Sequence, residues 1–207
     1  MTDTRVRIIW DTNVFVQALI MGQEQILDYL DDLIWQSEQE LIDLIVPKAV
    51  QAELYGILRA GRLNRINDAG EKVRNYAFSH SEVMYLLEAF PTLFDFDFLS
   101  ELEAYAWPAD LDYKYTLFAI LHAEYGWSDW GQSVIETRLL HSVEHLGLKD
   151  QLDFPIMAAA LIEGIDLLVS SNMKDFIDAL GKIRVMKSHD ARRFDHFSLH
   201  RDSSDYE

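Results

Sequence analysis

Carboxylate side chains stand at the borders of apolar segments of this sequence, where they can do chemistry. Asp11 directly follows the apolar segment Val6–Trp10, and Asp153 opens a predicted helix. Glu53 lies on the apolar border of another predicted helix, where a lone carboxylate is costly unless it has a partner. Carboxylates that converge repel one another, so their convergence favours a divalent cation such as Mg²⁺ or Mn²⁺. Such a site suits phosphoester chemistry.

Short apolar strands that alternate with helices must position these groups. The strands are predicted at residues 6–10, 41–46, 166–170 and 183–187. The helices are predicted from about residue 14, over residues 24–39, from Pro47 to about residue 60, and over residues 153–163 and 174–180. This alternation predicts an α/β fold, a three-layer α/β/α sandwich with a mostly parallel central sheet.

The carboxyl ends of the strands should form the site. In an open α/β sheet, ligands bind outside these ends. Asp11 follows the first strand, and Ser170, Ser171 and Asn172 follow the third. We therefore expect these residues at one edge of the sheet.

The 207 residues are expected to form a single domain over residues 1–199. Residues 62–147 are predicted to be a long and mostly helical insertion, with breaks near Ser79, Pro91, Pro108 and residues 126–131. Residues 200–207 are predicted to be a disordered tail.

The charge of −17 argues at first against a nucleic-acid partner. It is unevenly spread, however: eight acidic residues and no Lys or Arg lie between Asn75 and Tyr113. This acidic segment is predicted to be a solvated surface or a surface for a protein partner. Two stretches are locally basic, with Arg59, Arg62, Arg65, Lys72 and Arg74 in one and Lys182, Arg184, Lys187, Arg192 and Arg193 in the other.

Composition excludes several classes of protein. The chain has no cysteine, which excludes a disulfide scaffold, a zinc ribbon and a thiol nucleophile. No apolar run approaches the roughly 20 residues of a membrane span, and residues 1–10 contain no secretion signal. These features predict a soluble, cytoplasmic protein with no membrane partner.

Four motifs together resemble those of the PIN-domain nucleases. Asp11-Thr12-Asn13 after an apolar strand looks like the opening motif of that family, and Val46-Pro47 followed by Glu53 is similar to its second acidic position. Residues 153–160 and 168–176 resemble its third and fourth motifs. The resemblance covers a little under half of the chain, and the order and strand–helix context of the motifs make it fairly specific.

The resemblance implies a PIN-like fold and a metal-dependent ribonuclease that hydrolyses RNA phosphodiester bonds. It implies Mg²⁺ or Mn²⁺ ligands, which are also the catalytic residues, at Asp11, Glu53 and Asp153. Where the family often has a fourth aspartate, this chain has Asn172, with Asp175 one helical turn later, so either residue is expected to complete the metal site. Glu53 and Asp153 lie 100 positions apart, which is longer than a compact toxin-type member needs.

The remaining site residues are expected to bind or orient substrate. The expected partner is single-stranded RNA, and a homodimer is compatible with the sequence. The residues predicted to contact substrate are Thr12, Asn13, Ser170, Arg59, Arg62 and Arg65.

Three alternatives stay open. Asp11, Asp153 and Asn172 can be helix caps rather than ligands. The sequence His141-Ser-Val-Glu144-His145 fits the H-x-x-E-H pattern of inverted zinc peptidases, although nothing else in the chain resembles them. A PIN-like binding or regulatory module with weak or no catalysis is the alternative function.

Overall fold

The computed structural model describes ten separate parts of the chain. They are residues 5–21, 23–61, 63–66, 72–104, 127–128, 132–133, 156–157, 159–160, 163–171 and 184–186. The predicted limits of the domain and the predicted C-terminal tail fall largely outside these residues.

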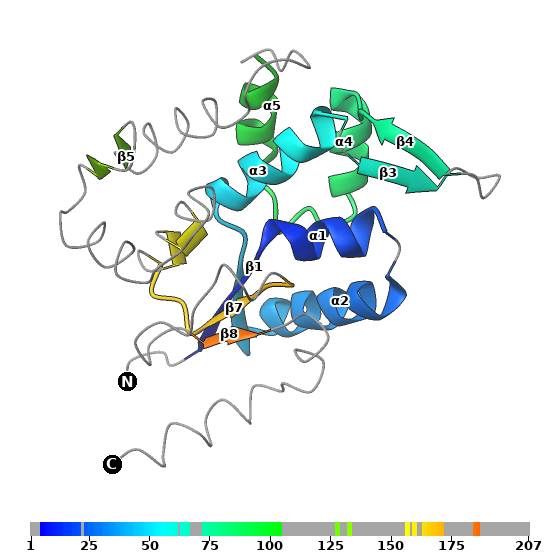
Figure 1. Ribbon diagram of the computed structural model, residues 1–207. Helices are drawn as coiled ribbons and strands as arrows, with labels where there is room; N and C mark the ends of the chain where they lie inside the picture. Colours follow the sequence, from blue (N-terminus) through cyan, green and yellow to red (C-terminus); the bar gives the residue numbers. More distant parts are fainter. Residues whose placement is uncertain are drawn as a thin grey trace, which may run out of the picture.

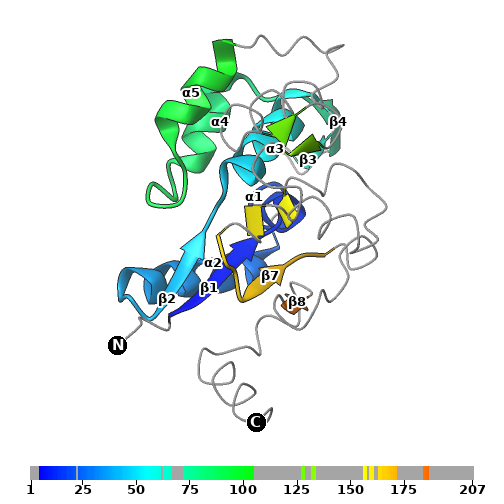
Figure 2. The same ribbon diagram turned by 90° about the vertical axis from the view of Figure 1, so that its left-hand side faces the viewer.

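A small parallel sheet lies at the centre of the described structure (Figures 1 and 2). Its order is β2-β1-β7-β8, and every neighbouring pair is parallel. The strands are β1 (Val6–Trp10), β2 (Ile42–Ile45), β7 (Leu167–Val169) and β8 (Arg184–Met186). Each predicted strand is confirmed to within one residue at either end. Parallel strands of this kind need crossover connections, and helices supply the one from β1 to β2.

Three helices confirm the predicted α/β alternation. They are α1 (Thr12–Leu19), α2 (Glu24–Glu38) and α3 (Lys48–Arg59). Helix α1 packs against both α2 and α3, while α2 packs against β2 (Figure 1). Helix α1 begins two residues earlier than predicted, directly after Asp11. Of the predicted helix 153–163, residues 156–157 and 159–160 are helical and buried, and Glu163, the other described residue, lies in a turn.

Aromatic packing links the sheet to its helices. Trp10 at the end of β1 is fully buried. Its ring centroid lies 5.7 Å from that of Phe15 on α1 and 5.7 Å from that of Tyr29 on α2. Large aromatic side chains bury much apolar area, so this contact fixes both helices against the sheet.

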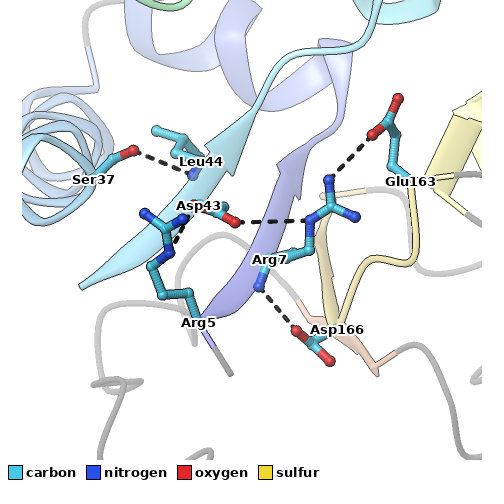
Figure 3. Close-up of polar contacts among 7 residues, drawn as sticks. All are labelled: Arg5, Arg7, Ser37, Asp43, Leu44, Glu163 and Asp166. Atoms are coloured by element: carbon cyan, nitrogen blue, oxygen red, sulfur yellow. Dashed lines mark hydrogen bonds and ion pairs between the residues drawn. The ribbon is translucent and has the colours of Figure 1, made fainter. Parts of the chain in front are cut away.

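Charged side chains fasten the strands at the edge where they begin, which we call the amino edge. Figure 3 shows Arg7 of β1 between Asp43 of β2 and Glu163, with N–O distances of 3.8 and 3.2 Å. The backbone N–H of Arg7 also donates to the Asp166 carboxylate at 2.9 Å. These side chains are about one-third exposed, so each ion pair contributes only about 0–1 kcal/mol. Their main effect is to hold β2, and the residues that precede β7, in register with β1.

The inserted region differs from the prediction. It does contain helices α4 (His80–Leu87) and α5 (Phe96–Ala104), and Ser79 begins α4 with a capping box that includes Glu82. The prediction of a mostly helical segment is wrong at its start, however, where β3 (Leu63–Ile66) and β4 (Lys72–Tyr76) form an antiparallel hairpin. Two further short strands, β5 (Trp127–Ser128) and β6 (Gln132–Ser133), also pair.

Turn chemistry explains the hairpin. Gly61 adopts a left-handed φ of 67°, which ends α3 because other residues are strained in that conformation. Asn67, Asp68 and Gly70, which lie in sequence between the strands, are residue types that favour turns over helices.

No helix among the described residues is long and apolar enough to cross a membrane.

The buried Tyr29 makes stability sensitive to alkaline pH. Burial raises the pKa of Tyr29 well above its ordinary value of 10, and the Asp32 carboxylate raises it further. Above pH 10 the unfolded chain releases this phenolic proton while the folded chain keeps it, so the free energy of unfolding should fall as pH rises. One proton corresponds to a slope of up to about 1.4 kcal/mol per pH unit.

Urea unfolding between pH 8 and pH 11 measures this slope. Tyr29→Phe should make it shallower, while Tyr85→Phe, at a position that is 80 % exposed, should follow the wild type. Equal slopes for all three proteins would contradict the role of Tyr29.

Candidate functional site

Asp11 and Ser170 meet at the edge where the parallel strands end, which we call the carboxyl edge. The register pairs Trp10 with Val169, the last residues of β1 and β7. The Asp11 N–H continues this pairing by donating to the Val169 carbonyl at 2.9 Å. The Asp11 carbonyl accepts the first hydrogen bond of α1, from the Val14 N–H at 3.0 Å. The expectation that Asp11 and Ser170 share one edge is confirmed.

Neutral hydrogen-bond donors hold the Asp11 carboxylate. Asp11 is 3 % exposed and Ser170 is fully buried. The Ser170 hydroxyl donates to Oδ2 of Asp11 at 2.7 Å, and the Asn13 amide donates to the same oxygen. A buried carboxylate is costly without such partners, and these two hydrogen bonds offset part of that cost. They also fix the orientation of the carboxylate.

Asn13 connects the two sides of the carboxyl edge. Its Nδ2 lies 3.2 Å from the Ser170 hydroxyl, and its Oδ1 accepts hydrogen bonds from the backbone N–H and the hydroxyl of Ser171, at 2.9 and 2.7 Å. The end of β1 is thereby joined to the residues that follow β7. Ser171 was expected at this edge, because it follows the third predicted strand, but it was given no role in the site.

Glu53 reaches the same edge from α3. Its Oε2 accepts a hydrogen bond from the Thr12 hydroxyl at 2.5 Å, and its side chain is partly buried. Thr12 directly follows Asp11 and is 2 % exposed. The structure therefore brings together Asp11, Thr12, Asn13, Glu53 and Ser170, from three separate parts of the sequence. Their oxygens are hard donors of the kind that Mg²⁺ and Mn²⁺ prefer.

The other predicted ligands lie outside the described residues. They are Asp153, Asn172 and Asp175, together with His141, Glu144 and His145 of the zinc alternative. Within the described parts of the chain, no group of three or more His, Asp or Glu side chains is arranged to hold a metal ion. A third ligand beside Asp11 and Glu53 stays a prediction.

Of the arginines predicted to bind substrate, Arg59 lies at the far end of α3. Arg59 donates from Nη1 to the Phe78 carbonyl at 2.9 Å, which joins α3 to the segment before α4. Arg62 is outside the described residues, and Arg65 lies in β3. Contact of these arginines with a nucleic acid stays a prediction, and the structural contact of Arg59 had no signal in the sequence.

A second polar group on α3 lies apart from the carboxyl-edge cluster. The Tyr55 hydroxyl lies 2.9 Å from Nδ1 of His80, and Nε2 of His80 lies 3.5 Å from the Glu103 carboxylate. Burial raises the pKa of Tyr55, although the nearby Arg59 cation opposes this shift. These contacts join α3, α4 and α5.

No protein-family model matches this chain, and no curated protein and no solved structure matches it either. The resemblance to PIN-domain nucleases therefore rests on the four motifs in the sequence.

The Asn13 amide can be tested by changing its charge. Asn13→Asp removes the donor and places a second carboxylate against Asp11, so it should lower the free energy of unfolding at pH 7 by about 1–3 kcal/mol. Asn13→Ala loses the same hydrogen bonds without adding a charge, and it should be the less destabilised variant.

The gap between these two variants should narrow near pH 4, where carboxylates take up protons. Denaturant unfolding at both pH values measures it. Equal stability of the two variants at pH 7 would show that Asp11 carries no negative charge facing Asn13.

Proposed function

We propose that this protein is a metal-dependent ribonuclease with a PIN-like three-layer α/β/α fold, which hydrolyses RNA phosphodiester bonds. One observation carries the proposal. At the carboxyl edge of a parallel sheet, the buried carboxylate of Asp11 accepts hydrogen bonds from Ser170 and Asn13. A second carboxylate, Glu53, accepts a hydrogen bond from Thr12, the residue that follows Asp11. This edge is where α/β sheets bind their ligands.

The chemistry of the cluster fits a hard divalent cation. Asp11 and Glu53 would hold Mg²⁺ or Mn²⁺, with Asp153 and either Asn172 or Asp175 as further ligands. Such a cation supplies an activated water and stabilises negative charge on the phosphate. The hydrogen bonds from Ser170 and Asn13 would orient Asp11 toward such a cation.

The chain's own residues orient these carboxylates. Ser170 and Asn13 fix one oxygen of Asp11, and Thr12 fixes one oxygen of Glu53. Such outer contacts set the direction in which a ligand presents its lone pairs, so their loss weakens metal binding without removing a ligand. They are positioning residues in this proposal.

Replacing the buried carboxylate tests the function. Asp11→Asn should abolish Mn²⁺-dependent cleavage of single-stranded RNA, because a charged ligand is lost. The new amide keeps an oxygen for Ser170 and removes a buried charge, so the melting temperature should stay the same or rise. Gel assays of labelled RNA and thermal unfolding measure the two effects.

Asp97→Asn is the matched control, because it removes one negative charge from an exposed position in the first turn of α5. It should retain full cleavage. Cleavage by Asp11→Asn at the wild-type rate would overturn the assignment.

Calorimetry separates catalysis from the alternative of a PIN-like binding module. The wild type should bind Mn²⁺ in millimolar solution, and Ser170→Ala should bind it about 10–100-fold more weakly. No binding of Mn²⁺ or Mg²⁺ by the wild type would favour the binding module and contradict the nuclease.

A further inference from the structure

The face of helix α2 that carries Trp35, which we call the outer face, departs from the pattern of an amphipathic helix. Helix α2 packs against α1 and β2 (Figure 1), and its buried residues are Ile26, Tyr29, Leu30 and Leu33. Because successive helical residues are rotated by about 100°, Trp35 lies almost directly opposite this buried side. It is 55 % exposed. A surface helix normally carries polar side chains there, so the folding of α2 does not call for a tryptophan at this position.

Leu41 adds a second exposed apolar side chain at the same end of α2. It is 39 % exposed. Glu40 adopts a left-handed φ of 58°, and its N–H donates to the Ser37 carbonyl at 3.0 Å. The N–H of Leu41 donates to the Gln36 carbonyl, also at 3.0 Å. This Schellman ending turns the chain back on the helix, so Leu41 lies beside the last turn, to which Trp35 belongs.

Acidic side chains surround Trp35 on the outer face. Between Arg7 and Lys48 the chain holds eight acidic residues and no Lys or Arg. Those at exposed positions of α2 are Glu24, Asp28, Asp31, Asp32 and Glu38. Asp31 lies four residues before Trp35 and Glu38 lies three residues after it, so the three side chains are neighbours on the helix surface. Among the described residues, none of these acids has an ion-pair partner.

The charges of the outer face work against the stability of the helix itself. Asp28 lies three residues before Asp31 and four before Asp32, and like charges at these spacings repel. Glu38 is in the last turn, at the negative end of the helix dipole, and that turn holds no basic residue. Residues that conflict with local folding rules are expected where a surface serves function, so these acids point to a positively charged partner.

The charge and the aromatic ring together define the chemistry of that partner. A negative face repels the phosphates of a nucleic acid, and the same face of a second copy would bring like charges together. A helix that binds a membrane surface carries Lys and Arg on its polar face, and α2 has neither. Arginine fits both features, because its planar guanidinium stacks on a tryptophan ring and also pairs with carboxylates. Lysine matches the charge but not the planar stacking.

We propose that the outer face of α2, with Trp35 and Leu41 as its apolar part, binds an arginine-rich segment of a partner protein. One arginine of that segment stacks on Trp35 and pairs with Asp31 or Glu38. The aliphatic stem of another packs on Leu41. The outer face shares no residue with the carboxyl-edge cluster, so this proposal does not rest on the proposed function.

A peptide of alternating arginine and alanine tests the tryptophan. Its labelled form should bind the wild type, measured by fluorescence anisotropy, and Trp35→Ala should weaken this binding about tenfold, because the stacking is lost. A peptide with lysine in place of arginine should bind the wild type more weakly, and Trp35→Ala should no longer distinguish the two peptides. Tyr85→Ala is the matched control, at a position that is 80 % exposed, and it should bind as the wild type does.

A second pair of variants tests the charges. Asp31→Asn/Glu38→Gln removes the two carboxylates that flank Trp35, and it should weaken binding about threefold to tenfold and make it less dependent on salt. Asp97→Asn/Glu101→Gln is the matched control, because it removes the same two types of charge from exposed positions of α5. This control should bind nearly as the wild type does, which separates the outer face from the general negative charge of the protein.

Equal affinity of the wild type and Trp35→Ala for the arginine peptide, or an equal loss in Tyr85→Ala, would overturn the proposal. A wild-type dimer that Trp35→Ala converts to a monomer, measured by sedimentation, would assign the face to a second copy and would also overturn it. Cleavage of RNA separates the proposal from the nuclease assignment. Binding of the peptide through Trp35 without any cleavage of RNA would support the outer face and overturn the nuclease, and the opposite result would overturn the outer face alone.

Discussion

The pairing of β1 on both sides with parallel strands is the constraint from which the site follows. Parallel strands all end at one edge, and β1 lies between β2 and β7. The chain therefore leaves β1 at Asp11 beside Ser170, which follows β7, while β2 leads into α3 and so to Glu53. A slip of one residue in the β1–β7 register would turn every side chain of one strand to the other face and separate Asp11 from Ser170.

The two edges of this sheet differ in how deeply their charged side chains are buried. At the amino edge, Arg7 and its carboxylate partners are partly exposed, and the pairs hold register at little energetic cost. At the carboxyl edge, the Asp11 carboxylate is buried beside the neutral donors Ser170 and Asn13. Hydrogen bonds offset part of the cost of burying a carboxylate, and a buried carboxylate of this kind is a candidate for function.

Hydrophobic pattern was enough to predict the elements that build this edge. Three patterns each predicted one type of element, and the structure confirms them. They are the apolar run of β1, the helical spacing of α2 and the start of α3 after Pro47. The hairpin was missed because its strands, LNRI and KVRNY, contain no run of apolar residues like residues 8–10 of β1 or Leu167–Val169 of β7. The hydrogen bonds of Tyr55 and Arg59 were also missed, since their partners lie 25 and 19 residues away and no local pattern encodes such contacts.

Helix α3 makes the position of Glu53 depend on parts of the chain remote from it. Successive residues of a helix are rotated by about 100°, so Tyr55 points away from Glu53, toward His80. Near the start of the helix, the Gln51 side chain bonds the Val46 carbonyl at 2.7 Å and the Asp95 N–H at 2.9 Å. Because α1, α4 and α5 all pack on α3, the inserted region helps to hold the Glu53 carboxylate against Thr12. The insertion is therefore part of the scaffold that holds the carboxyl edge.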